Sequence, residues 1–203
     1  FPAPSGYRAG AVDDHILSLI DVTATTLAFA GLERPPLMQG RVFLGEKADP
    51  ARTYAFGARD RIDETQQRIR SVHDRRFHYI RTLSSGPTFA SLNRYKEKCF
   101  PIIGVMRELE SRGKLSGPPL DLMRRAGPCE ELYDIDADPH EVRDLVASSD
   151  PLHREALARL RAALDAWLIE TGDRGAVAEP AAVVAPFAAE MHQWFGTPAW
   201  YKP

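Results

Sequence analysis

The feature that most constrains this 203-residue sequence is an amphipathic helix signal that begins near residue 150. Asp150 is a typical N-cap residue, and Pro151 follows at the first helical position, where the missing N–H of proline costs nothing. Apolar residues then recur at helical spacing before Gly172, at Leu157, Leu160, Leu164, Trp167 and Leu168. A helix with one apolar stripe must bury it, so the chain requires a second layer with a matching face.

The second layer is predicted to be a β-sheet. Residues 68–83, RIRSVHDRRFHYIRTL, alternate large and polar side chains around a turn at Asp74 and Arg75, as a hairpin does. Further strands are expected at residues 52–60 and 129–136. Strands of this kind combined with a separate amphipathic helix predict an α+β fold.

Three other segments give weaker signals. Residues 84–128 are expected to form long, irregular connections with a short helix at 105–111, because Gly and Pro interrupt them. Residues 13–31 are expected to form a helix that is capped by Asp13 or Asp14 and is apolar or small on nearly all sides, so it needs partners on more than one side. The alanine-rich tail after Gly175 predicts a short helix and an arm lying on another surface.

The net charge and the residue composition argue against several classes of partner. A net charge of -2 gives no basic excess, so nucleic acid and anionic membrane surfaces are not expected as partners. The longest apolar stretch, residues 16–32, is too short and too polar to span a bilayer. Cys99 and Cys129 are too far apart for a CxxC motif, and whether they form a bridge stays open. Since the first residue is Phe1, we expect that something precedes it in a longer protein.

The acidic run at residues 130–145, EELYDIDADPHEVRDL, imitates a calcium-binding loop in the spacing of its aspartates. The glycine and the closing glutamate of such a loop are replaced by Pro139 and Leu145, which can neither make its turn nor close its coordination sphere. We therefore expect a polar turn whose carboxylates accept backbone N–H groups, followed by a turn of helix from Pro139 to Leu145. No metal site is predicted.

Known catalytic motifs are absent from the sequence, which lacks GxSxG, P-loop, GxGxxG and HExxH patterns. The densest polar cluster is residues 57–70, GARDRIDETQQRIR, at the end of a predicted strand. Arginine offers forked donors to anions and carboxylates accept from hydroxyls, so this cluster suits a polar, anionic or sugar-like ligand. The residues alone favour a solvated, salt-bridged loop over such a binding site.

Several segments, taken in order, resemble the C-terminal part of type I sulfatases. Residues 38–45, MQGRVFLG, match a MQG-x-x-FLG pattern, and residues 131–145 match ELYD-x-x-x-DP-x-E-x-x-(D/N)L. The similarity runs over most of residues 7–175, and the nearest branch is the bacterial heparan N-sulfatase (sulfamidase, N-sulfoglucosamine sulfohydrolase-like) and arylsulfatase-like enzymes. Ala24 stands where proline is usual, and Arg75 stands where glycine is common.

The resemblance implies a division into three parts. Residues 1–48 would be a loop and one helix left from an alkaline-phosphatase-like α/β catalytic domain, residues 49–175 the sulfatase C-terminal subdomain, and residues 176–203 a C-terminal arm. The subdomain is expected to hold an antiparallel sheet of about four strands packed against the C-terminal amphipathic helix. The formylglycine motif C/S-x-P-x-R is absent, since Cys99 is followed by FPII and Cys129 by EELY. Formylglycine and calcium are therefore expected in a missing N-terminal catalytic domain, and no cofactor in this chain.

The resemblance also implies that the whole enzyme, a sulfuric ester hydrolase, hydrolyses sulfate esters or sulfamates of sugars. This chain is expected to be inactive alone and to contribute substrate-pocket loops, with sugar contacts from Arg59, Asp60, Asp63 and Glu64. Two alternatives stay open, namely a non-catalytic remnant that binds sugar or protein, and a phosphodiester or phosphonate hydrolase of the same superfamily. Without its partner domain, the chain is expected to form a homo-oligomer through the helix at 13–31.

Overall fold

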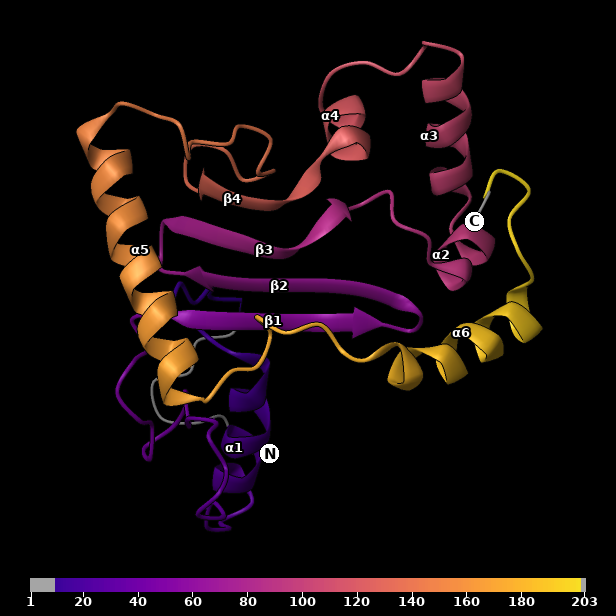
Figure 1. The fold of residues 1–203 in the computed structure, drawn as a ribbon. Coiled ribbons are helices and arrows are strands. Elements are labelled where there is room, and N and C mark those ends of the chain that lie inside the picture. Colours follow the sequence, from indigo (N-terminus) through magenta and orange to yellow (C-terminus); the bar gives the residue numbers. More distant parts are fainter. Residues whose placement is uncertain (1–9, 202–203) are drawn as a thin grey trace.

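A computed structural model describes residues 10–201, which form one antiparallel sheet and six helices (Figure 1). The sheet has the strand order β1-β2-β3-β4, with every neighbouring pair antiparallel. Its strands are β1 (Ala55–Ile62), β2 (Thr65–His73), β3 (Phe77–Pro87) and β4 (Ala126–Asp134). The helices are α1 (Leu19–Phe29), α2 (Arg94–Cys99), α3 (Pro101–Ser111), α4 (Pro118–Arg124), α5 (Pro151–Glu170) and α6 (Ala181–Phe195). The predicted α+β class with a small antiparallel sheet is confirmed.

The predicted hairpin is the pairing of β2 with β3, in which His73 lies opposite His78. The turn lacks the glycine that tight turns usually need, and Asp74 compensates for its absence. Its Oδ1 accepts hydrogen bonds from the backbone N–H groups of Arg76 and Phe77, at 2.8 and 2.7 Å, and so stabilises the turn from within.

Helix α5 crosses the sheet at the end where β2 meets β3 (Figure 1). It begins as predicted, since Oδ1 of Asp150 accepts from the N–H of Leu152 at 2.8 Å. Its apolar stripe packs on the sheet and completes the hydrophobic core between the two layers. The buried residues of this core are Val72, Phe77, Tyr79, Leu132, Leu145, Ala156, Leu157, Leu160 and Leu164. Burying each leucine fully contributes roughly 1.5–3 kcal/mol, so this contact is the main apolar support of the sheet.

The helix expected at 13–31 is shorter than predicted, because α1 begins only at Leu19. Asp13 does not cap it and instead accepts from the N–H of His15 at 3.0 Å. The start is set by Asp21, whose Oδ2 accepts from the N–H of Ser18 at 2.8 Å, as in a capping box.

The prediction for residues 84–128 is partly right, because the short helix expected at 105–111 lies within α3. The remaining connections are not irregular as predicted, since they contain α2 and α4 between β3 and β4. Pro101 and Pro118 lie in the first turns of α3 and α4, where proline favours a helix instead of breaking it. These helices gather toward the end of the sheet opposite α5, with α2 beside the β1–β2 turn and α4 leading into β4 (Figure 1).

The acidic run forms turns, as predicted, without the expected turn of helix between Pro139 and Leu145. Asp138 Oδ2 accepts from the N–H groups of Val142 and Arg143, at 2.8 and 2.7 Å. This arrangement holds Glu141 at a φ of 52°, outside the right-handed helical region.

The predicted helix of the tail is α6, whose C-terminal half lies against α2 at the rim of the sheet (Figure 1). Among the residues with described coordinates, no helix combines the length and the apolar character needed to cross a bilayer.

Candidate functional site

The candidate site is the tip of the β1–β2 hairpin, where the four predicted contact residues lie. A register shift between Arg59 and Arg61 forms an irregularity at Asp60, and Asp63 has a φ of 51° in the turn. Bulges of this kind redirect side chains near binding sites, and aspartate tolerates the left-handed conformation better than most residues.

Arg59 is a half-buried arginine with a neutral partner. Its Nη2 donates to Oε1 of Gln67, and its Nε is buried without a hydrogen-bond partner in the described part of the chain. Burial lowers the pKa of Arg59 because desolvation disfavours its charged form. Gln67 is itself held by its Nε2, which donates to the carbonyl of Pro87 at 3.2 Å, to the carbonyl of Thr88 and to Oγ of Ser91.

Asp60 is half exposed but already has a cationic partner inside the chain. Its Oδ1 accepts from Nη2 of Arg70 at 2.7 Å, and Nε of Arg70 donates to Asp173 at 2.9 Å. The side chain of Arg70 is only 1% exposed. Burial by itself would lower the pKa of Arg70, yet the hydrogen bonds to Asp173 and Asp60 outweigh it and the pKa is raised. Asp60 therefore serves to neutralise a buried cation.

Glu64 faces the start of α2 and is 6% exposed. Its Oε1 accepts hydrogen bonds from the backbone N–H of Arg94 at 2.8 Å and from Nη1 of Arg94 at 3.3 Å. Oε2 of Glu64 and Nε of Arg94 are buried and form no hydrogen bond within the described residues. Asp63 accepts from Nδ2 of Asn93 at 3.3 Å, and Asn93 caps α2 by accepting from the N–H of Lys96. The hairpin tip and α2 are thus held together by both acidic residues.

The C-terminal arm holds the same tip from its other side. Arg61 on β1 forms an ion pair with Glu179 at 2.8 Å, and its guanidinium lies 3.9 Å from the ring centroid of Phe187 on α6. The ring of Phe195 contacts Tyr95 of α2 with centroids 5.7 Å apart. The tip therefore lies between α2 and α6.

Arg59, Asp60, Asp63 and Glu64 lie in one region of the structure, but their surroundings differ. Sequence reasoning missed Gln67, which orients Arg59, together with its partners in the loop after β3. The sequence around Gln67 carries no signal for this role, because the contacts join residues about twenty positions apart.

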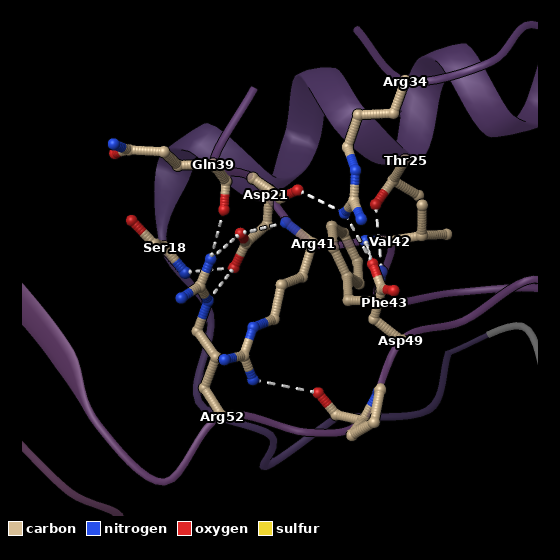
Figure 2. Close-up of polar contacts among 12 residues, drawn as sticks. Ser18, Asp21, Thr25, Arg34, Gln39, Arg41, Val42, Phe43, Asp49 and Arg52 are labelled. Carbon is tan, nitrogen blue, oxygen red and sulfur yellow. Dashed lines mark hydrogen bonds and ion pairs between the residues drawn. The ribbon is translucent and has the colours of Figure 1, made fainter. Parts of the chain in front are cut away.

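A second polar cluster lies far from this tip and centres on Asp21 of α1 (Figure 2). The Asp21 side chain is 1% exposed and accepts from Nε of Arg52 and from the N–H of Arg41, both at 2.8 Å. Burial by itself would raise the pKa of Asp21, but the hydrogen bonds from Arg52, Arg41 and Ser18 outweigh it and lower the pKa to about 2.

The segment that this cluster fixes is the MQG-x-x-FLG motif at residues 38–45. Oγ1 of Thr25 accepts from the N–H of Phe43 at 3.1 Å, and Oδ2 of Asp49 accepts from the N–H of Val42 at 2.7 Å. A Cβ at Gly40 would collide with the carbonyl oxygen of Ile20, so the loop can lie on α1 only with glycine there. The motif that carries the family resemblance therefore acts structurally in this chain.

Among the described residues, nothing fits the calcium ion or the formylglycine that the resemblance implies for the whole enzyme. No group of three or more His, Cys, Asp or Glu side chains that could hold a metal ion occurs among residues 10–201. Neither cysteine stands in a C-x-P-x-R sequence.

Comparison with known proteins identifies relatives that match most of the chain. No protein-family model matches it. An "Ulvan-active sulfatase" of Formosa agariphila is 33% identical over 170 residues, which cover 84% of this chain and 28% of that protein. The "N-sulphoglucosamine sulphohydrolase" of Homo sapiens is 28% identical over 181 residues, covering 82% of this chain and 35% of that protein. The solved structure of a "2-O GAG sulfatase" is 20% identical with a TM-score of 0.49, covering 80% of this chain and 27% of that one.

The chain thus spans about a third of the length of the curated relatives that it matches. The matched region contains both sequence patterns on which the resemblance was based. By this similarity, the chain belongs to the sulfatase family and corresponds to the C-terminal part of its members.

Proposed function

We propose that this chain is the C-terminal portion of a sulfatase that hydrolyses sulfate esters or sulfamates of sugars, and that it shapes the substrate pocket without being catalytic by itself. The observation that carries the proposal is the 33% identity with an ulvan-active sulfatase across 84% of the chain. The absence of C/S-x-P-x-R from the sequence supports the non-catalytic role. Calcium and formylglycine would belong to another part of the protein.

The surface of α1 supports a partner domain in the same enzyme. Asp21, Ala24 and Thr25 are buried against the MQG-x-x-FLG loop, whereas the opposite face exposes Leu19 and Val22, with Leu19 89% exposed. An apolar helix face of this kind is typical of an interface. In our proposal, residues 1–48 are the tail of the α/β catalytic domain and pack on the rest of that domain through this face. Residues 49–175 are the C-terminal subdomain that carries the pocket loop, and residues 176–203 form the arm.

The test is turnover by the polypeptide encoded by the complete reading frame that contains this chain. We expect hydrolysis of an aryl sulfate by that protein and none by the 203-residue chain alone. Faster turnover of an aryl phosphodiester than of the sulfate would replace the proposal with a phosphodiester hydrolase. If neither substrate is hydrolysed but the isolated chain binds sugar, the chain is a binding remnant.

A further inference from the structure

The arginines around the hairpin tip differ in how their charge is balanced. Arg61 pairs with Glu179, Arg70 with Asp60 and Asp173, and Arg94 with Glu64. Neither Arg59 nor Arg68 has a carboxylate within ion-pair distance among residues 10–201. The guanidinium of Arg68 donates instead to the backbone carbonyls of Leu83, Gly175 and Ala176, whereas Arg59 has no such set of acceptors in the described residues. Burying a cation without a counter-charge costs free energy. We therefore expect an anion from outside these residues to bind at Arg59.

The surroundings of Arg59 hold its guanidinium in place without neutralising it. The neutral amide oxygen of Gln67 accepts a hydrogen bond from Nη2 of Arg59. The amide nitrogen of Gln67 donates to two backbone carbonyls and to Oγ of Ser91, which holds the amide in place. Nε has an unused donor but is shielded from solvent, whereas Nη1 donates no hydrogen bond within the described part of the chain and is left for a ligand. An oriented guanidinium with unused N–H groups can form forked hydrogen bonds to a sulfate or carboxylate.

The two acidic neighbours do not compete for this role. Asp60 is used by the buried Arg70, and Glu64 is used by Arg94 and the start of α2. Their carboxylates also neutralise Arg70 and Arg94, so these two cations do not compete with Arg59 for the ligand.

We propose that Arg59 is the anion-binding residue of the pocket loop, that it binds a sulfate or carboxylate of an anionic sugar, and that Asp60 and Glu64 are internal counter-ions and not ligand contacts. This inference rests on the proposed function for the identity of the ligand as a sugar. It reduces the four expected sugar contacts to one, Arg59. Asp63 serves the turn and α2.

The first test is calorimetric titration of the complete 203-residue chain with D-glucosamine 2-N,6-O-disulfate, with glucuronic acid and with uncharged N-acetylglucosamine. We expect binding of at least one anionic sugar and none of the uncharged one. The two anionic probes separate a sulfate from a carboxylate as the group that is bound. Arg59→Gln should weaken the binding roughly 10- to 100-fold, the effect of losing a charged hydrogen-bond donor. Arg59→Lys should recover part of it, since lysine keeps the charge without the fork.

A matched pair of variants tests the charge without removing Arg59. Ile69 lies directly opposite Arg59 on β2, so Ile69→Glu would supply the missing carboxylate across the strands, and Ile69→Gln has the same shape without the charge. We expect Ile69→Glu to bind roughly tenfold more weakly than Ile69→Gln. Arg75→Gln is the control for net charge, since Arg75 is exposed and pairs with the exposed Asp14.

The Nε resonance of Arg59, assigned with Arg59→Lys, gives a direct readout by NMR. The proposal requires that it shift on titration with the binding sugar. An unshifted resonance, or equal affinity for Ile69→Glu and Ile69→Gln, would overturn it. Aryl sulfate turnover by the full-length protein is independent of these measurements, so the two proposals can fail separately.

Discussion

The Asp21 cluster leads to a quantitative prediction about acid stability. Lowering the pKa of a carboxyl from 3.8 to about 2 corresponds to roughly 2.5 kcal/mol of folding free energy, at about 1.4 kcal/mol per pKa unit. Because the folded-state pKa is the lower one, this contribution is complete above about pH 4 and is lost as the pH falls toward 2. Asp21→Asn should therefore destabilise the chain by about 2–4 kcal/mol at pH 7, since it also leaves Arg52 without its carboxylate.

The assay is urea unfolding between pH 7 and pH 2, followed by circular dichroism. The difference in unfolding free energy between the unmodified chain and Asp21→Asn should be constant down to about pH 4 and should shrink below it. Asp14→Asn, at an exposed position, is the matched control and should leave the profile unchanged. Parallel profiles for the unmodified chain and Asp21→Asn down to pH 2 would refute the reasoning.

Three further outcomes are expected. Leu164→Ala should cost about 2–5 kcal/mol in urea unfolding, because Leu164 is fully buried under the sheet, whereas Leu152→Ala at an exposed position of α5 should cost far less; equal costs would contradict the assigned core. Gly40→Ala should cost about 1–3 kcal/mol, since its Cβ would meet the backbone of Ile20, and unchanged stability would show that the loop does not lie on α1. The isolated chain should self-associate in sedimentation velocity and Leu19→Glu should reduce this, so a strictly monomeric chain would disprove the expected role of the α1 face.

The parts of the fold that could be predicted are those with local signals. The cap at Asp150 and the leucine stripe define α5 within one stretch of sequence, and the alternation around Asp74 defines the hairpin. The first turn of α3 and the whole of α4 are not predicted, for a local reason as well. Pro101 and Pro118 were read as interruptions, although proline in the first turn of a helix is favourable.

The sequence points to a candidate site, but it does not predict the different surroundings that its residues have in the structure. Charged residues at the end of a strand and the family resemblance both pointed to Arg59 and its neighbours. Which of them keeps an unbalanced charge depends on Asp173 and Arg94, which lie 103 residues after Arg70 and 30 residues after Glu64. No periodicity within the hairpin encodes such distant pairs.

The three-helix insertion between β3 and β4 also has a kinetic consequence. Strands β1 to β3 form a meander with short turns, whereas β4 can join only after residues 88–125 have been brought round. Closing that longer loop costs about 2 kcal/mol more in chain entropy than closing a turn of three residues. We therefore expect β4 to pair after the folding transition state, so Leu132→Ala should mainly speed unfolding and Val72→Ala should slow folding, and the reverse result would refute this order. Because Leu132 belongs to the core that α5 covers, we expect α5 to pack fully on the sheet only after β4 has paired with β3.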